Sequence, residues 1–258
     1  MKGKRHASRS QRSELAVDPT LLTALESHRS IRRYKPEPIP PEHVQRMMRA
    51  AQRVSTGGAG QLYSLVRVTD RELRIQLAER MGGQAHVATA AEFFVACLDT
   101  NRLRRLLEHR GLVVGVRPLS LYATADALLA LANLATAAEA LGYGICYASS
   151  MHRELETVIA LLHLPQGVCP LVGLCVGVPD EAPEQSPRLP LTIVFHENHY
   201  HELTPDDLDH CYDSMAGAKY AGGWFESLSQ HFTEGKEYET RERYWRRALQ
   251  RQGFEVTL

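Results

Sequence analysis

The sequence is organised around a short basic run, Ser27-His28-Arg29-Ser30-Ile31-Arg32-Arg33-Tyr34. Guanidinium groups match phosphate oxygens with paired hydrogen bonds, and neighbouring serine and histidine side chains donate to the oxygens that remain. A charged run is more often a solvated surface, so the run by itself suggests a phosphate site without establishing one. It follows an amphipathic segment and is therefore expected at the C-terminal end of a helix.

The residues on either side of this run predict helices and strands in alternation. Asp18-Pro19 supplies a cap and a first-turn proline for a helix that ends near His28, and Pro40-Pro41 begins a second helix. The glycine-rich stretch 56–60 breaks the pattern. Later elements are a strand at 62–69, a helix at 70–78 capped by Asp70, a buried strand at 92–98, an irregular basic stretch at 101–118 and a long helix at 120–141.

The second half of the chain gives a weaker pattern. It predicts a helix capped by Ser149 or Ser150, an apolar strand at 171–178, a proline-rich loop at 179–190 and a final strand at 191–196. A short helix at 205–215, a glycine- and aromatic-rich loop and a charged helix at 239–250 complete the chain. Alternating helices and strands are typical of a parallel sheet, but these strands are few and unevenly spaced, so an α+β sheet is equally open.

Composition and charge exclude several classes of protein. The 258 residues contain 30 Lys+Arg and 30 Asp+Glu, so no overall field attracts nucleic acid or an anionic membrane. An apolar content of 44% is ordinary for a soluble enzyme with one large core. The apolar stretch 119–141 is long enough to span a bilayer, but Asp126, Asn133 and Glu139 would lie in hydrocarbon, so we expect a buried core helix instead.

Two further features bear on the compartment. Residues 1–13 contain five basic residues and no acid, and we expect residues 1–17 to form a disordered basic tail. A transit peptide is the alternative, but the stretch is short and lacks an apolar face. The five cysteines are odd in number, contain no CxxC pair and lie mostly in apolar segments, which indicates reduced thiols and a cytoplasmic protein.

Common catalytic motifs are missing from the sequence. It contains neither a GxxxxGK[ST] phosphate loop nor a GxSxG nucleophile turn. Gly142-Tyr143-Gly144 resembles part of a dinucleotide fingerprint, but it follows a helix and lacks the third glycine, so we interpret it as a helix stop. The cluster at 196–201 has three histidines without HExxH spacing, and His196 and His199 would face opposite sides of a strand. We therefore predict no metal site.

Several short motifs occur together in the order and spacing of one family. They are His28-Arg29-Ser30-Ile31-Arg32, Gly82-Gly83-Gln84-Ala85-His86-Val87, Ala138-Glu139-Ala140-Leu141-Gly142, Pro170-Leu171-Val172-Gly173-Leu174-Cys175-Val176-Gly177, Pro187-Arg188-Leu189-Pro190 and His196-Glu197-Asn198-His199-Tyr200. On these residues the chain resembles the flavin-dependent nitroreductase family over roughly residues 20–200. It is most similar to the NADPH-dependent oxygen-insensitive nitroreductases and NADPH:flavin oxidoreductases.

The resemblance implies an α+β fold, in which an antiparallel sheet is flanked by helices, and an intertwined homodimer with FMN at the interface. Residues 18–200 would form the FMN-binding core, and residues 201–258 a partly helical extension that contacts the partner subunit. The implied FMN-binding residues form four groups. They are His28, Arg29, Ser30, Arg32 and Arg188 at the phosphate and ribityl chain; Gln61 and Gln84 at the isoalloxazine ring; Tyr147, Ala148, Ser149 and Ser150 beside that ring; and Thr56, Gly57 and Gly58 from across the dimer.

The family's chemistry also follows from the resemblance. NADH or NADPH would pass hydride to flavin N5 in a ping-pong cycle, and a small-molecule acceptor (a nitroaromatic, a quinone or free flavin) would then be reduced at the same face. Because the cofactor carries this chemistry, no catalytic side chain is expected. Two alternatives stay open: a flavin-binding protein with little turnover, and a specialised reductase with a narrow acceptor, for which residues 101–118 or 216–235 would supply a lid. A zinc hydrolase built on the histidine cluster is a distant fourth.

The chain departs from the family pattern at four places. Ser186 replaces the usual lysine of Lys-Pro-Arg, which removes one phosphate-facing cation and predicts weaker FMN binding. The family's serine-rich run is glycine-rich here, at 56–60, and its Gly-Gly beside the ring is Ser149-Ser150. In the extension, Glu237 stands where an arginine would meet the 2′-phosphate of NADPH. We therefore expect weak discrimination for NADPH or a preference for NADH, although Lys236, Arg241 or Arg243 would be substitutes.

Overall fold

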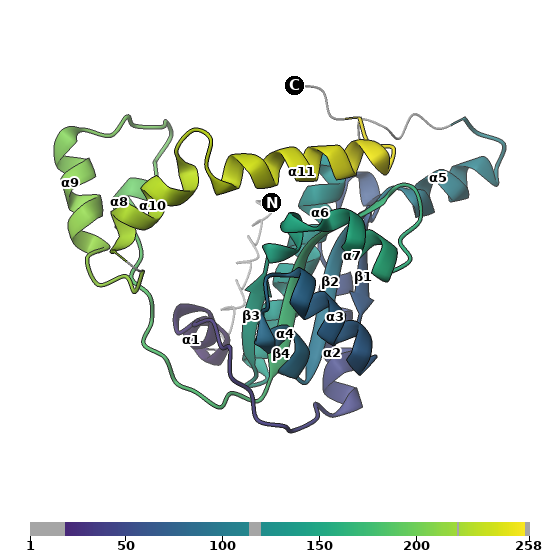
Figure 1. Ribbon diagram of the computed structural model, residues 1–258, viewed down its shortest axis with the longest axis horizontal. Helices are drawn as coiled ribbons and strands as arrows, with labels where there is room; N and C mark the ends of the chain where they lie inside the picture. Colours follow the sequence, from purple (N-terminus) through teal and green to yellow (C-terminus); the bar gives the residue numbers. More distant parts are fainter. Residues whose placement is uncertain (1–18, 114–119, 221, 256–258) are drawn as a thin grey trace, which may run out of the picture.

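A computed structural model describes residues 19–113, 120–220 and 222–255. Its centre is a four-stranded sheet in the order β1-β2-β4-β3, in which every pair of neighbouring strands is antiparallel (Figure 1). The strands are β1 Tyr63–Arg67, β2 Glu92–Asp99, β3 Gly144–Ala148 and β4 Val168–Gly177. This confirms an α+β fold with an antiparallel sheet and settles the alternative that the sequence pattern had left open.

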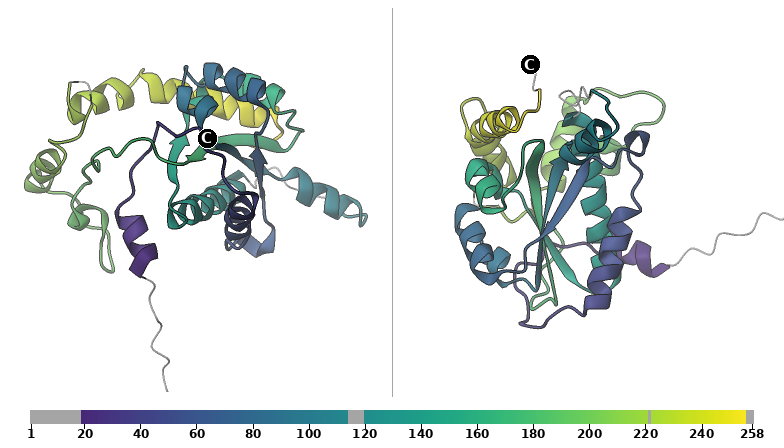
Figure 2. Two further views of the ribbon diagram at one scale, coloured as in Figure 1. Left: turned by 90° about the horizontal axis from the view of Figure 1, so that it is seen from below. Right: turned by 90° about the vertical axis from the view of Figure 1, so that its right-hand side faces the viewer.

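Helices cover both faces of the sheet, and Figure 2 shows the two layers edge-on. On one face lie α1 Pro19–Glu26, α2 Pro41–Gln52 and α6 Ser120–Ala140, with α6 packed along the strands. The other face is covered by α3 Arg71–Arg80, α4 Ala85–Thr89, α7 Leu155–Leu161 and α11 Glu237–Arg251. Short 3₁₀ turns lie at Gly57–Ala59 and Ser150–Arg153.

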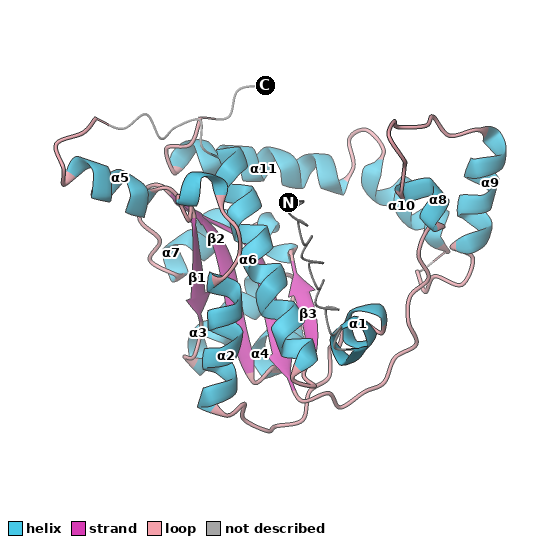
Figure 3. Ribbon diagram, turned by 180° about the vertical axis from the view of Figure 1, so that it is seen from behind, coloured by secondary structure: helices cyan, strands magenta, loops and turns pink. Residues whose placement is uncertain are grey.

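The remaining helices stand away from this core. They are α5 Asn101–Glu108, which projects beyond β1, and α8 Leu191–Val194, α9 Pro205–Ser214 and α10 Trp224–Phe232, which form an arm (Figure 3). A long loop leads from β4 past α1 to this arm, and α11 then brings the chain back over the sheet (Figure 1). The extension is therefore joined to the core at both of its ends.

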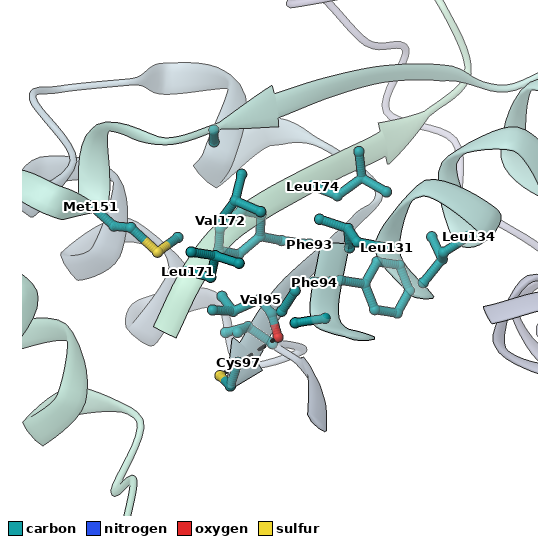
Figure 4. Packing of buried hydrophobic residues seen from close by; sticks show 14 of the residues in the cluster. Phe93, Phe94, Val95, Cys97, Leu131, Leu134, Met151, Leu171, Val172 and Leu174 are labelled. Atoms are coloured by element: carbon teal, nitrogen blue, oxygen red, sulfur yellow. Dashed lines mark hydrogen bonds between the residues drawn. The ribbon is translucent and has the colours of Figure 1, made fainter. Parts of the chain in front are cut away.

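The core is built on the two central strands. Every residue of β2 and β4 is buried, as expected when both faces of a sheet are covered. Phe93 and Phe94 are fully buried on opposite faces of β2, and Figure 4 shows Phe94 close to Leu131 and Leu134 of α6. Burial of each such side chain stabilises the fold by about 1.5–3 kcal/mol.

Helix α6 is the one described helix that is long and apolar enough to cross a membrane. In this structure its small residues Ala123, Ala127 and Ala130 are fully buried against the protein instead. Two of its polar residues, Asp126 and Asn133, tie neighbouring segments to it. Asp126 accepts hydrogen bonds from the amides of Gly57 and Leu62 at 3.3 and 2.9 Å, and Asn133 donates to the carbonyl of Ala50. The prediction of a buried core helix is confirmed for this side of α6, whereas its other side is exposed.

Some predicted elements were wrong. The stretch 191–196 was expected to be a strand but forms helix α8, because Pro190 sets a backbone angle that suits a helix start. Two stretches expected to be irregular contain helices, namely α5 and α10. Ser149 precedes a 3₁₀ turn without capping it, and β3 was missed. The predicted disordered tail at 1–17 lies outside the described residues.

Asp126→Ala should lower the free energy of unfolding by about 1–3 kcal/mol, because the Leu62 amide, and partly that of Gly57, would lose its buried acceptor. Urea unfolding at one fixed protein concentration measures the change. Asn133→Ala, on the same helix, removes a single exposed hydrogen bond and serves as the control. Equal effects of the two substitutions would contradict this account of Asp126.

Candidate functional site

The basic run is fixed to the edge of the sheet at β3. The amide of Ile31 donates to the carbonyl of Ile145 at 2.8 Å, and Ser30 forms an isolated bridge with the same residue. A Cβ at Gly144 would lie 2.7 Å from the side chain of Ile31, so only glycine permits this approach. The side chains of His28, Arg29 and Arg32 are consequently held beside β3.

His28 and Arg29 lie at the start of β3, where α6 ends. The imidazole Nδ1 of His28 is 2.6 Å from a carboxylate oxygen of Glu139, in the last turn of α6. Arg29 donates to the carbonyl of Pro183 at 3.2 Å, which ties the run to the loop after β4. A hollow of about 240 Å³ lies here, lined by residues that include Arg29, Glu139 and Glu181.

Arg32 reaches the other side of β3. Its backbone amide, like that of Arg33, donates to the carboxylate of Glu181, which lowers the pKa of that acid. Burial lowers the pKa of His86, and the positive charge of Arg32 lowers it further, so the guanidinium lies near the imidazole. Burial raises the pKa of Cys146, which Arg32 partly offsets. Within the described residues the guanidinium itself has no hydrogen-bonding partner.

Two side-chain atoms at the start of α4 are buried without a partner. Gln84 donates through Nε2 to the hydroxyl of Ser150 at 2.7 Å, but its Oε1 atom has no donor. The Nε2 atom of His86 is buried and unpaired in the same way. Burying a polar atom without a hydrogen bond costs about 1–3 kcal/mol, so two such atoms at the start of one helix indicate a place that a polar ligand completes.

The far end of β3 carries the other residues expected beside the flavin ring. Tyr147 is 43% exposed, and burial followed by the charge of Glu139 raises the pKa of its phenol. Ala148 is buried, whereas Ser149 is exposed at the strand's end. Because a strand rises about 3.3 Å per residue, Ile145 and Ser149 are about 13 Å apart. The group is therefore elongated, with cations near one end and amide and hydroxyl groups at the other.

Arg188 lies on a loop that contacts the basic run, but its side chain makes no hydrogen bond or ion pair with the other described residues of this group. Its guanidinium turns back onto the carbonyls of Ser186 and Pro187 in its own loop. The loop itself runs along the basic segment, because Gln185 donates to the carbonyl of Glu26 and Arg29 donates to that of Pro183. Arg188 is exposed and free to rotate toward a ligand.

Thr56, Gly57, Gly58 and Gln61 lie elsewhere in the chain. They precede β1, at the opposite edge of the sheet from β3, and three strand spacings separate the two edges by about 14 Å. Gly57 approaches the ring of Tyr122 on α6, and Gln61 accepts a hydrogen bond from Arg102. A single chain therefore divides the predicted residues into a β3-edge group (28–32, 84, 147–150 and 188) and a β1-edge group (56–61).

Two residues next to the β3-edge group, His86 and Glu139, had no role in the sequence interpretation. His86 and Glu139 both fall inside the motifs that carried the family resemblance, but nothing in the sequence shows what they face. Glu139 did carry a local signal, because a carboxylate in the last turn of a helix opposes the helix dipole and needs a compensating contact. The structure supplies that contact in His28.

The histidine cluster at 196–201 lies in the arm. His196 packs against the ring of Tyr200, with centroids 4.6 Å apart, and accepts a hydrogen bond from the amide of His201. Within the described ranges, no group of three His, Cys, Asp or Glu side chains could hold a metal ion. The contacts found here are those of a folded loop.

Comparison with known proteins agrees with this geometry. The model of the nitroreductase family matches residues 25–178. The chain is 40% identical over 187 residues to an oxygen-insensitive NADPH nitroreductase of Salmonella typhimurium, covering 72% of this chain and 77% of that protein. It is 38% identical over 205 residues to an NADPH-flavin oxidoreductase of Vibrio harveyi, covering 80% and 84%.

A solved structure gives the same result. The NADPH:FMN oxidoreductase of Vibrio harveyi, determined in complex with NAD⁺, superposes with a TM-score of 0.80 at 33% identity. The match covers 91% of this chain and 98% of that one, so it includes most of the arm and the returning helix as well as the sheet.

The lowered pKa of His86 predicts a pH-dependent stability. A histidine in the unfolded chain has a pKa near 6.5, whereas the pKa of folded His86 is lower, so the unfolded chain binds more protons as the pH falls. The free energy of unfolding should therefore decrease from about pH 7 to about pH 5. His86→Asn should make this fall shallower, as measured by urea midpoints across that range. His109→Asn, at an exposed position after α5, should leave the slope unchanged. A slope that His86→Asn does not alter would contradict the assignment.

Proposed function

The chain belongs to the nitroreductase family, and on that premise we propose that it is an FMN-dependent oxidoreductase that takes electrons from NADH or NADPH. Its acceptors are small molecules of the nitroaromatic, quinone or free-flavin type. The observation that carries the proposal is a pair of buried, unpaired atoms at the start of α4, namely Oε1 of Gln84, whose amide contacts Ser150, and Nε2 of His86, which lies in the field of Arg32.

The β3-edge group fits FMN in shape and chemistry. His28 and Arg29, with the backbone of Ser30, would hold the phosphate and the ribityl chain at the start of β3. Gln84 would donate to the isoalloxazine ring or accept from it, beside Ser149 and Ser150. Tyr147 and Ala148 line the path between these ends, and Arg188 would close over the phosphate from its loop.

The protein's own contribution is binding and orientation. Bound flavin supplies the hydride chemistry, first accepting from a reduced nicotinamide and then reducing the acceptor. Arg32 would add a further cation for the phosphate and the ribityl chain. Ser149 leaves an exposed hydroxyl at the mouth of the site, where nicotinamide and acceptor would bind in turn.

A homodimer completes the site. The exposed side of α6 is apolar, with Leu121 74% and Leu129 49% exposed, and contiguous exposed apolar surface is typical of an interface. The arm also exposes Leu191, Phe195 and Phe225. A second copy that covers these surfaces would bring its Thr56, Gly57, Gly58 and Gln61 to the β3-edge group of the first, and the extension 201–258 would wrap the partner.

A reducing compartment suits the chain. All five cysteines are free and buried in the described structure, which supports a cytoplasmic location. The proposed partners are a second copy and small molecules, and the balanced charge gives no reason to add nucleic acid or a membrane.

Arg32→Ala and Arg188→Ala should each weaken FMN binding by about 1.5–3 kcal/mol, because each removes a charged hydrogen bond to the cofactor. Fluorescence titration of the apoprotein with FMN measures the change. Arg46→Ala removes a guanidinium from the exposed side of α2, outside the hollow that Arg49 and Gln61 line, and is the matched control. If neither substitution at the site weakens FMN binding, the assignment of these two residues to the cofactor is wrong, although the family membership still holds.

The nicotinamide preference follows from charges in the extension. Arg241 donates to Glu237 at 2.6 Å and is only 13% exposed, so this guanidinium is already paired. Glu237 also pairs with Arg153. These pairs occupy Arg241 and Arg153, so of the cations in this segment only exposed ones such as Lys236 and Arg243 would be left for the 2′-phosphate that distinguishes NADPH from NADH.

NADH should therefore reduce the bound flavin about as well as NADPH does. Anaerobic bleaching of the visible flavin bands by each nucleotide gives the two rates directly. A kcat/KM advantage of tenfold or more for NADPH, about 1.4 kcal/mol, would contradict this expectation. A flavin that neither nucleotide bleaches would instead favour a flavin-binding protein without reductase activity.

A further inference from the structure

A cavity of about 300 Å³ lies where α11 crosses the core. Helix α11 lines it with Tyr238 and Trp245, and strand β4 lines it with Leu171. The ring of Tyr238 is held in place by stacking on Phe232, with centroids 4.3 Å apart. Aromatic and apolar walls are typical of small-molecule sites, and this volume is at the small end of their range. The cavity therefore has room for one or two fused rings.

The cavity adjoins the place predicted for the flavin ring. The 3₁₀ turn Ser150–Arg153 belongs to both, because the hydroxyl of Ser150 accepts from Gln84 at 2.7 Å and His152 lines the cavity. A 3₁₀ helix rises about 2 Å per residue, so Ser150 and His152 are about 4 Å apart along the turn. Ser149, directly before the turn, lines the cavity as well. A molecule in the cavity would thus lie next to the contact between Gln84 and Ser150.

The charged groups at the cavity wall are paired. Arg241 donates to Glu237 at 2.6 Å, and Glu242 accepts from Arg246 at 2.8 Å. Burial lowers the pKa of His152, which keeps this imidazole neutral at pH 7. An ion that entered the cavity would lose its water without gaining a free partner of opposite charge. The cavity accordingly favours a neutral guest.

We propose that this cavity binds a neutral aromatic molecule of one or two rings, which packs against the indole of Trp245. The inference rests on the proposed function, which makes this molecule the electron acceptor. Small quinones and uncharged nitroaromatics fit such walls, whereas free FMN is larger and carries a dianionic phosphate. Trp245 is then a residue that determines which acceptors bind.

The two tryptophans of the chain allow a direct binding test. Trp224→Phe leaves Trp245 as the single tryptophan, whereas Trp245→Phe leaves Trp224, which lies in the arm against Tyr212. Titration of each oxidised holoenzyme with 1,4-naphthoquinone, in the absence of nicotinamide, should quench the fluorescence of Trp245 saturably. The fluorescence of Trp224 should show only the unsaturable loss that absorption of light by the quinone causes.

Glu237→Gln tests the charge balance, because it takes away the carboxylate that pairs with Arg241. In the Trp224→Phe protein, 1,4-naphthoquinone-2-sulfonate should bind at least about tenfold more weakly than the neutral quinone. Addition of Glu237→Gln should tighten sulfonate binding by about fivefold or more. Glu234→Gln removes an exposed carboxylate of the same extension that forms no ion pair in the described structure, and it should change the affinity by less than about twofold.

Steady-state kinetics tests whether the bound molecule is the acceptor. Trp245→Leu keeps an apolar side chain but removes the aromatic face, and it should raise the KM for naphthoquinone by about threefold or more. The KM for ferricyanide, a charged metal complex that does not pack in an apolar cavity, should stay unchanged. Circular dichroism shows whether each variant is folded.

The outcomes separate the binding site from the proposed function. Saturable quenching of Trp245 alone, tighter sulfonate binding by Glu237→Gln and a selective rise in the quinone KM would support the proposal. Fluorescence of Trp245 that responds no more than that of Trp224, or a sulfonate that binds as tightly as the neutral quinone, would overturn it. An unchanged quinone KM in a folded Trp245→Leu variant would overturn the acceptor assignment. A flavin that neither nucleotide bleaches would overturn the proposed function, whatever the quinone titration shows.

Discussion

The contact between residues 30–34 and the edge of the sheet is the constraint on which the site depends. Ile31 is 4% exposed and lies against Gly144, and Tyr34 lies against Gly177, in both cases where a Cβ would approach to 2.7 Å. The phenol of Tyr34 donates to the carbonyl of Ile31 at 2.6 Å and closes this turn. Glycines on two adjacent strands therefore let this loop lie close to the sheet, which holds the basic residues between and before Ile31 and Tyr34 in place.

The position of the β1-edge group depends on a second tie, between Asp126 and the loop before β1. Helix α6 carries both this tie and the Glu139 contact, which are thirteen residues apart, or about 20 Å along the helix axis. One rigid element thus sets the separation of the two groups of site residues. That separation is too large for a short ligand to bridge within one chain, which is why the exposed leucines of α6 and the division of the site lead to the same dimer.

Much of the core could be predicted from local pattern. Asp70 caps α3 through the amide of Leu73, and Pro41 begins α2, because caps and first-turn prolines act within a few residues. The edge strand β3 was missed because five residues flanked by glycine carry little periodicity. The strand expected at 191–196 was wrong because sequence alone does not show whether a sheet has an edge left to pair.

The site was predictable as a set of residues and not as an arrangement. Motif order named His28, Gln84 and Ser150 together, but the strand order that puts Gln61 at the opposite edge depends on contacts between distant segments. The sequence likewise does not show that Arg241 is paired with Glu237. A paired guanidinium offers less positive charge to a ligand than a free one does. The unpaired atoms of Gln84 and His86 are visible only once their neighbours are placed.

The two-edged layout has a genetic consequence. In the proposed dimer each site takes its β3-edge group from one subunit and its β1-edge group from the other. A subunit that is damaged at one edge inactivates only the one site that contains this edge. Two alleles, each inactive alone and damaged at different edges, would therefore complement one another in mixed dimers, in which one of the two sites is assembled wholly from undamaged parts.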